Sequence, residues 1–215
     1  MDRRRDDVLA REHAALTEDL QALSREQWAQ GSLCAGWTVH DVVAHLGAVL
    51  TGGWTSWAAH MLRAGLRPEV YNRRRISRFA GPTPEETLSR FAAIGSRHGE
   101  AMRPATRRTV PWLGEVIVHA QDIRRPLGLE RTPEQDSVLA VATFFASRDY
   151  TVRSRSQVRG LHLRATDASF AHNPPELPAV RGPLLALVMV MAGRPAYLED
   201  LAGSGVATLR RRMTR

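Results

Sequence analysis

The chain has 215 residues, 43% of them hydrophobic, which suits one or two globular domains with a sizeable core and excludes a disordered polymer. Its formal net charge is +8, and all 30 basic residues are arginine. The absence of lysine indicates a GC-rich coding sequence, and the arginines are scattered along the chain. The charge therefore does not predict the single basic face of a nucleic-acid-binding protein, and nucleic acid is not an expected partner.

Cysteine content and hydropathy indicate the compartment. Cys34 is the only cysteine, which excludes an internal disulfide and fits a reducing environment. The chain starts with a charged, helical pattern and not with a signal peptide. The longest apolar run, 184–192, is much shorter than the roughly 20 residues that span a membrane. We therefore expect a soluble, cytoplasmic protein that does not associate with a membrane.

Helical patterns dominate the first part of the chain. Apolar residues spaced three and four apart predict a helix over about 6–28. After a loop containing Cys34, Thr38 and Asp41 form a capping box for a second helix that runs toward residue 62. Residues 63–82 are rich in arginine and poor in periodic apolar positions, which predicts a long mobile loop.

Later start and stop signals divide the rest of the chain. Thr-Pro-Glu sequences at Thr83 and Thr132 predict helices that run to about residues 102 and 149, and another helix between them ends near Gly128. Loose alternation over 158–163 predicts a strand, and an apolar helix follows over 184–192. The pattern predicts a helical bundle over residues 1–150 and a small α/β domain over 151–215.

The helix before Gly128 carries the strongest chemical signal. Glu115, His119 and Asp122 fall within an arc of roughly 60° beside an apolar stripe. A carboxylate and an imidazole four residues apart on a half-buried helix face can bind one metal ion. The same spacing is also that of an ordinary helix-surface contact, so the residues alone leave both interpretations open.

A metal site in a helical bundle needs a further ligand from a facing helix. His45 is the leading candidate, but periodicity alone does not select it, because His40 lies on the other flank of the same apolar stripe. The alternative for His45 is a histidine at the edge of the core that is hydrogen-bonded to backbone.

Two segments resemble the signatures of a known family. SLCAGWTVHDVVAHL (32–46) and GEVIVHAQDIRRPLG (114–128) are similar to those of the DinB-like, mycothiol-dependent maleylpyruvate isomerase family. GLHLRATDASF and VRGPLLALVMVMAGRPAYLEDLAGSGV resemble its sterol-carrier-protein-like C-terminal domain. The resemblance covers most of the chain. It implies a mainly α fold, with a DinB-like four-helix bundle over 1–150 followed by a small α/β domain over 151–215.

The resemblance also implies a site. The family binds a divalent metal, usually zinc, through positions that fall on His45, Glu115 and His119. Two histidines and one carboxylate leave coordination positions open, as in a catalytic zinc site. The implied activity uses mycothiol as thiol cosubstrate on a small electrophilic substrate. In an isomerase the thiol adds to an activated double bond and leaves after rotation, and in an S-transferase it stays attached.

Other residues keep two interpretations each. Asp122 could orient an imidazole or pair with Arg124, Arg125 or Arg97. Arg194 resembles a family Gly-Arg and is the candidate catalytic residue, because it could hold a substrate carboxylate; its alternative is a cation at a helix end. Cys34 could be a reactive thiol or a fourth ligand, or a packed loop residue.

Aromatic residues and the arginine-rich segment complete the candidates. Trp37 is expected to anchor the core beside the helix cap, and Trp54 and Trp57 could line a substrate cavity or belong to the core. Residues 63–78 could form a lid over an anionic substrate or the thiol.

The overall prediction is an enzyme whose partners are a small-molecule substrate and a low-molecular-weight thiol, acting as a monomer or homodimer. Two alternatives remain: a non-catalytic, metal- or thiol-responsive binding or regulatory protein, and a hydrolase that uses metal-bound water.

Overall fold

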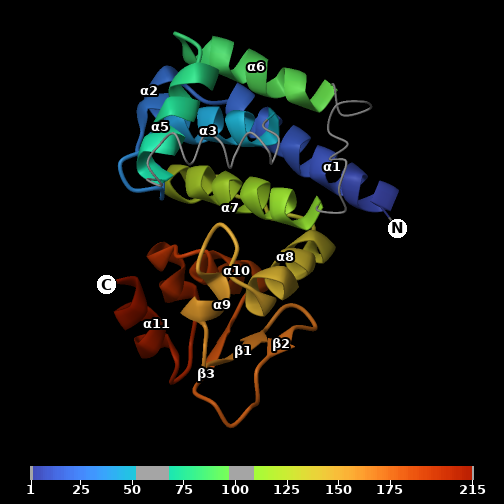
Figure 1. Cartoon of the computed structure of the whole chain (residues 1–215), viewed down its shortest axis with the longest axis vertical. Helices are drawn as coiled ribbons and strands as arrows, with labels where there is room; N and C mark the ends of the chain where they lie inside the picture. The colour runs from blue at the N-terminus through green and yellow to red at the C-terminus, as the bar shows by residue number, and fades with distance from the viewer. Residues whose placement is uncertain (1, 52–67, 97–108, 215) are drawn as a thin grey trace. The chain divides into compact units, whose positions relative to one another are not determined.

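The computed structural model describes residues 2–51, 68–96 and 109–214. The chain folds into two compact units, Met1–Arg131 and Thr132–Arg215. The first is helical, and the second combines helices with a three-stranded sheet (Figure 1). The predicted fold class, a mainly α protein with a helical bundle followed by a small α/β part, is confirmed.

The first unit is built around a four-helix bundle. Helix α1 packs against α6 and α7, and α3 packs against the same two helices. Fully buried side chains from all four helices, including Leu16, Leu46, Phe91 and Ile117, fill the centre. The bounds of the helices described in this unit are α1 Asp2–Gln21, α2 Arg25–Ala29, α3 Val39–Thr51, α5 Pro68–Phe79, α6 Pro84–Ser96 and α7 Thr109–Leu127.

The first predicted helix is divided in two. The expected helix over 6–28 was wrong in its length, because α1 ends at Gln21 and α2 starts after Ser24. Ser24 and Gln27 form a capping box in which each side chain bonds the other residue's backbone N–H, at 3.3 and 2.9 Å. This local hydrogen bonding starts a new helix. The capping box predicted at Thr38 and Asp41 is confirmed, and α3 follows it.

The prediction of a loop over 63–82 was wrong for its central part, since Pro68–Phe79 is helix α5. This helix packs against α3, and it buries Ile76. The Phe79 ring occupies the space that a side chain at position 47 would need, so Gly47 lets the two helices approach closely. Apolar residues three apart therefore make this segment helical although most of its positions are polar.

Several expectations fall outside the described residues. These are the extension of α3 toward residue 62 with Trp54 and Trp57, residues 63–67 of the predicted loop, and the extension of α6 to residue 102. None of the helices that the structure describes combines the length and apolar character needed to cross a membrane.

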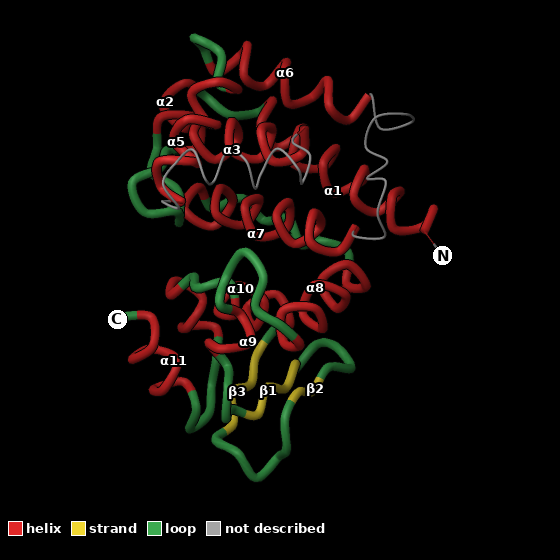
Figure 2. Tube along the Cα trace, in the orientation of Figure 1, coloured by secondary structure: helices red, strands yellow, loops and turns green. Residues whose placement is uncertain are grey.

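The second unit places an apolar helix on a small sheet (Figure 2). Strand β1 pairs antiparallel with β2 and parallel with β3, and Leu163 lies opposite Val180 in the parallel pair. Helix α10 packs on β1, β3 and α8, which explains why nearly all of its side chains are buried. The elements are α8 Gln135–Ser147, α9 Ser154–Gln157, β1 His162–Ala165, β2 Ala171–His172, β3 Ala179–Gly182, α10 Leu184–Met191, the 3-10 helix η1 Pro195–Asp200 and α11 Val206–Met213.

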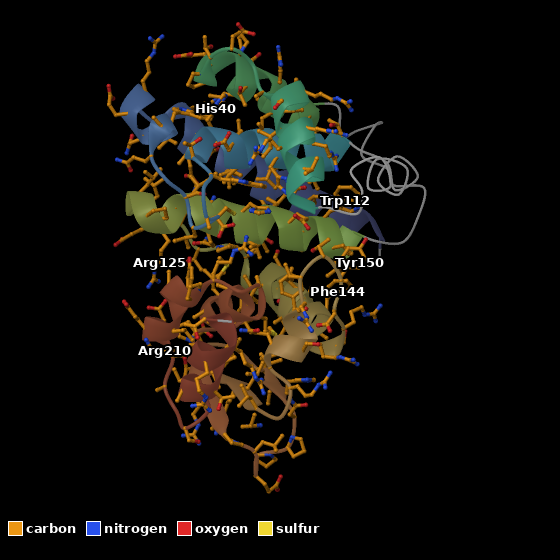
Figure 3. All side chains as sticks on the ribbon, turned by 60° about the vertical axis from the view of Figure 1, so that its left-hand side comes forward. His40, Trp112, Arg125, Phe144, Tyr150 and Arg210 are labelled. Atoms are coloured by element: carbon orange, nitrogen blue, oxygen red, sulfur yellow. The ribbon has the colours of Figure 1, made fainter. Side chains whose placement is uncertain are left out.

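The two units divide earlier than the sequence pattern suggested. We expected a boundary near residue 150, whereas the compact units separate between Arg131 and Thr132. Helix α8 falls in the second unit because its buried face, which includes Val141 and Phe145, packs against α10. Phe144 on α8 and Tyr150 just beyond its end, both labelled in Figure 3, have ring centroids 5.8 Å apart in an edge-on contact.

A buried ion pair ties α7 to α1. Arg124 is fully buried on α7, and its Nε donates to Asp19 Oδ2 on α1 at 2.7 Å. Arg131 Nε donates to the other oxygen of Asp19 at 2.9 Å. Because a buried guanidinium is costly unless it is paired, Asp19 stabilises the packing of the helix that carries Glu115 and His119.

We predict that Asp19→Ala lowers the free energy of unfolding by about 3–5 kcal/mol, because it leaves the Arg124 guanidinium buried without its partner. Glu85→Ala is the matched control, since it breaks the exposed pair with Arg25 and should cost less than about 1 kcal/mol. Urea unfolding of both variants measures the difference. Equal losses would show that the buried pair has no special importance.

Candidate metal centre

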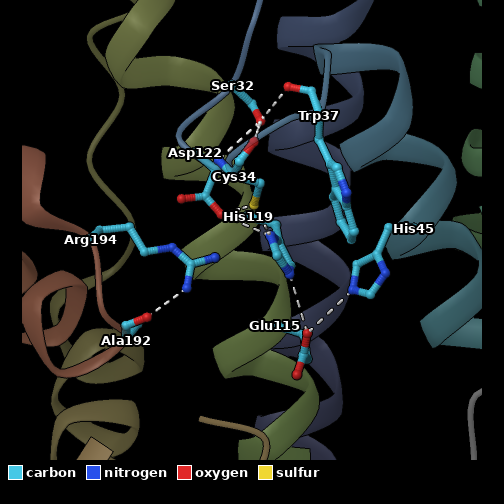
Figure 4. Close-up of polar contacts among 9 residues, drawn as sticks. All are labelled: Ser32, Cys34, Trp37, His45, Glu115, His119, Asp122, Ala192 and Arg194. Atoms are coloured by element: carbon cyan, nitrogen blue, oxygen red, sulfur yellow. Dashed lines mark hydrogen bonds and ion pairs between the residues drawn. The ribbon is translucent and has the colours of Figure 1, made fainter. Parts of the chain in front are cut away.

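Helices α3 and α7 bring His45, Glu115 and His119 together inside the first unit. His119 Nε2 lies 3.4 Å from Glu115 Oε2, and His45 Nε2 lies 3.9 Å from the same oxygen. One ligand atom from each residue lies within 4.8 Å of the others (Figure 4). The two imidazole rings meet edge to face, with centroids 4.9 Å apart. The residues that the sequence nominated as ligands therefore converge.

Local structure explains this convergence. Glu115 and His119 are one turn apart on α7, so their side chains lie on the same face, next to the buried Val116 and Ile123. His45 belongs to the buried face of α3 and is 8% exposed, as is His119. Since α3 packs directly on α7, its inward histidine meets the acid and imidazole of the facing helix.

His40 lies elsewhere. Its Nε2 is 2.7 Å from Thr87 Oγ1 on α6, and its ring makes an edge-on contact with Trp28. Periodicity could not decide between the two histidines of α3. The structure does, because His40 faces α6 and His45 faces α7. His40 is therefore a natural control for His45.

The donor spacing fits a metal ion. Zinc bonds of about 2.0–2.2 Å in a tetrahedral arrangement separate two ligand atoms by roughly 3.3–3.6 Å. The separations of 3.4 and 3.9 Å within the triad are close to this range. His45 Nδ1 is also buried without a hydrogen-bond partner among the described residues. This atom is not the ligand atom of the triad, because it is Nε2 of the same ring that faces Glu115.

Cys34, His119 and Asp122 form a second group of metal-ligand types that shares one imidazole with the first. Here the atoms are closer: His119 Nδ1 lies 2.8 Å and Cys34 Sγ 3.0 Å from Asp122 Oδ2. These are hydrogen-bond distances, which leave too little room for an ion between the atoms. The spacing therefore favours a metal on the Nε2 side of His119 and hydrogen bonding on its Nδ1 side.

This arrangement bears on the open assignment of Asp122. Its carboxylate accepts a hydrogen bond from the His119 imidazole, as expected of a residue that orients a ligand. Arg124, one of its alternative partners, pairs with Asp19. Another alternative, Arg97, lies outside the described residues.

Burial and hydrogen bonding set the charges of the triad. Burial alone would raise the pKa of Glu115, but the neighbouring imidazoles of His119 and His45 lower it far below its usual range, so the group is a carboxylate. Burial lowers the pKa of His45, which favours the neutral imidazole. Burial has the same tendency at His119, but hydrogen bonds with Asp122, Cys34 and Glu115 outweigh it and raise the pKa of this imidazole well above its usual value.

Two residues frame the triad from the loop between α2 and α3. The Trp37 ring tilts against the His45 ring, with centroids 4.9 Å apart, so it is a neighbour of the site as well as a packing residue. Cys34, whose contacts the sequence could not reveal, reaches Asp122 from the same loop. The sequence contains only one indication of these contacts. It places a cysteine and a tryptophan on either side of a glycine, just before the helix that carries His45.

Arg194 belongs to the second unit. It follows Gly193, whose φ of 84° ends α10, and its Nη1 donates to Ala192 O at 2.6 Å. This contact is the one expected of a cation at a helix C-terminus. Its role toward a substrate carboxylate remains a prediction.

The fold and the triad define a class: helical bundles with a histidine–carboxylate centre between two helices. Residues 9–124 match the sequence model of the mycothiol maleylpyruvate isomerase N-terminal domain, and the chain belongs to this family. Two crystal structures are similar in fold, that of the mycothiol-dependent maleylpyruvate isomerase and that of its histidine-to-alanine mutant. They are 19% and 18% identical to this chain, with TM-scores of 0.66 and 0.64. Each comparison covers 94% of this chain and 92% of the other. No curated protein sequence matches.

We predict that His45→Ala, Glu115→Ala and His119→Ala each weaken zinc binding at least about 100-fold, because two protein ligands hold zinc poorly. His40→Ala should bind zinc like the unchanged protein, since this side chain faces Thr87. Competition with a chromophoric chelator measures the affinities. Retention of zinc by all three triad variants would exclude the site.

We further predict that zinc affinity rises with pH, by about tenfold per unit while His119 is protonated. The raised pKa of His119 means that the metal-free protein holds a proton at pH 7, and zinc has to displace it. Asp122→Asn removes a carboxylate that raises this pKa, so the steep range should move to lower pH. The chelator competition repeated from pH 6 to 8 measures both profiles, and pH-independent affinity would contradict this account.

Proposed function

We propose that this chain is a metal-dependent thiol enzyme, of the isomerase or S-transferase type, acting on a small electrophilic substrate. The observation that carries the proposal is the convergence of His45, Glu115 and His119 from two helices within 4.8 Å. Membership in a family named for a mycothiol-dependent isomerase supports mycothiol, or a related low-molecular-weight thiol, as the cosubstrate.

The donor set supports catalysis over a structural role. Two imidazoles and one carboxylate are the ligand types of catalytic zinc sites, whereas structural zinc is held by four protein ligands, usually including cysteine. Cys34 hydrogen-bonds Asp122 on the far side of His119, so it does not complete the triad. A divalent metal at this centre, which we take to be zinc, would bind a thiol and deprotonate it at neutral pH.

The protein side chains prepare this chemistry. Glu115 supplies one negative charge, so the triad would only partly neutralise a divalent ion and leave it attractive to an anionic sulfur. Burial lowers the pKa of His45 and favours the neutral imidazole, which is the form that binds a metal. Asp122 holds the His119 ring through Nδ1 and leaves Nε2 directed at Glu115. The Trp37 ring packs at a tilt against the His45 ring, with centroids 4.9 Å apart.

The reaction type follows from what happens to the carbon–sulfur bond. In an isomerase-type reaction the sulfur adds to one carbon of an activated double bond, the remaining single bond rotates, and elimination regenerates the thiol. In an S-transferase-type reaction the new bond persists and a leaving group departs with the electron pair. Maleylpyruvate is a candidate because of the relatives' name. Arg194 is our candidate to bind a substrate carboxylate through its guanidinium.

We predict that the zinc-loaded protein binds mycothiol and that chelation abolishes the binding. Isothermal titration calorimetry with mycothiol before and after chelator treatment measures this, with Glu115→Ala as the metal-deficient control and His40→Ala as the metal-competent one.

Turnover is then measured with mycothiol and either maleylpyruvate or a haloaromatic thiol acceptor. Arg194→Ala should raise KM for a carboxylate substrate and leave zinc affinity unchanged. A zinc-loaded protein that neither binds the thiol nor turns over either substrate would overturn the proposed function.

A further inference from the structure

Cys34 makes an unusual contact for a loop cysteine. Its Sγ lies 3.0 Å from Asp122 Oδ2 and 3.6 Å from His119 Nδ1, while these two atoms are 2.8 Å apart. Sulfur, oxygen and nitrogen thus form a closed triangle on the side of the imidazole that faces away from Glu115 (Figure 4). Asp122 is completely buried, so its oxygen has to be satisfied by protein donors.

Hydrogen bonds within the loop that carries Cys34 restrain its conformation. Ser32 Oγ donates to Trp37 O at 2.9 Å, and the backbone N–H of Cys34 donates to Ser32 Oγ at 3.1 Å. Gly36 adopts a φ of 75°, which favours glycine and allows the chain to turn back toward α3.

The loop is also attached to α7 at the residue that the thiol contacts. The backbone N–H of Leu33 donates to the carbonyl of Asp122 at 3.0 Å. The loop therefore forms two hydrogen bonds with Asp122: the backbone of Leu33 bonds its carbonyl, and the Cys34 thiol bonds its carboxylate. Such double attachment fixes the carboxylate relative to the loop as well as to its own helix.

We propose that Cys34 and Asp122 are positioning residues for His119. The Cys34 thiol donates to Asp122 Oδ2, and the same oxygen accepts the Nδ1–H of His119, which keeps Nε2 directed toward Glu115 and His45. This deepens the proposed function and rests on it where metal affinity is concerned; the relay, by which we mean the hydrogen bonds from Cys34 to Asp122 and from His119 to Asp122, can be tested without a metal.

The relay would favour metal binding by restricting the rotation of the His119 ring in advance. An imidazole attached to a helix by two rotatable bonds loses rotational freedom when it binds a metal, and a carboxylate partner at the other nitrogen reduces that loss beforehand. The carboxylate has its own rotational freedom, which a second donor at the same oxygen restricts. Hydrogen bonds to an ionised acceptor are stronger than neutral ones, so even a weak S–H donor contributes here.

The first experiment compares zinc affinities of folded variants at one pH. Asp122→Asn should lose about 10- to 100-fold, and Cys34→Ala about 3- to 10-fold because one hydrogen bond to the carboxylate disappears. Cys34→Ser is the conservative rescue: its hydroxyl keeps a donor, so affinity should stay within about twofold of the unchanged protein. Unchanged affinity in Cys34→Ala would overturn the relay.

A double-mutant cycle tests whether Cys34 acts through Asp122. Cys34→Ala should cost nothing further in an Asp122→Ala background, because its acceptor is already gone. An undiminished cost in that background would overturn the proposal. Cobalt substitution distinguishes a ligand role: a thiolate-to-cobalt charge-transfer band that disappears in Cys34→Ser would also overturn it, since Cys34 would then bind the metal directly.

A metal-free readout separates this inference from the proposed function. In the metal-free protein, NMR should find the His119 Nδ1–H proton protected from exchange, with faster exchange in Cys34→Ala and restored protection in Cys34→Ser. If the unchanged protein binds no zinc yet shows this pattern, the proposed function fails and the relay stands. If zinc binds but exchange is equal in all three proteins, the relay fails and the proposed function stands.

Discussion

The Glu115 carboxylate between two histidines is the interaction on which the candidate site depends. It lies 3.4 Å from one imidazole and 3.9 Å from the other, and these come from helices that are distant in the sequence. Bringing an acid and two imidazoles into a core costs free energy unless they satisfy one another or a ligand. The packing of α3 on α7 and the attachment of α7 to α1 through Asp19 and Arg124 support this arrangement.

The two nitrogens of the His119 ring face different surroundings. On the Nε2 side, the spacing between donor atoms suits a metal ion; on the Nδ1 side, Asp122 and Cys34 are at hydrogen-bond distance. The same residue types thus serve different purposes because of differences of about half an ångström to an ångström. Composition of a cluster is therefore a weaker guide to a metal site than the distances within it.

Family membership and local geometry contribute separately to the functional conclusion. The match over residues 9–124 establishes the family, while structures at 18–19% identity establish only the fold. The function proposed for this chain is supported separately, by its intact histidine–carboxylate triad and by the burial that affects the charges of these residues. The second unit contributes a fold similar to that of the relatives, and Arg194 within it remains a proposal.

The sequence by itself determined the helical character, the capping box at Thr38 and the Glu115–His119 pair, because these depend on neighbours within one or two turns. It misjudged α5, whose few apolar residues become a packing face only against Gly47 of another helix. Only the tertiary structure separated His45 from His40 and joined Cys34 to Asp122. Such contacts depend on which helix faces which, and periodicity along one segment carries no information about its partner across the core.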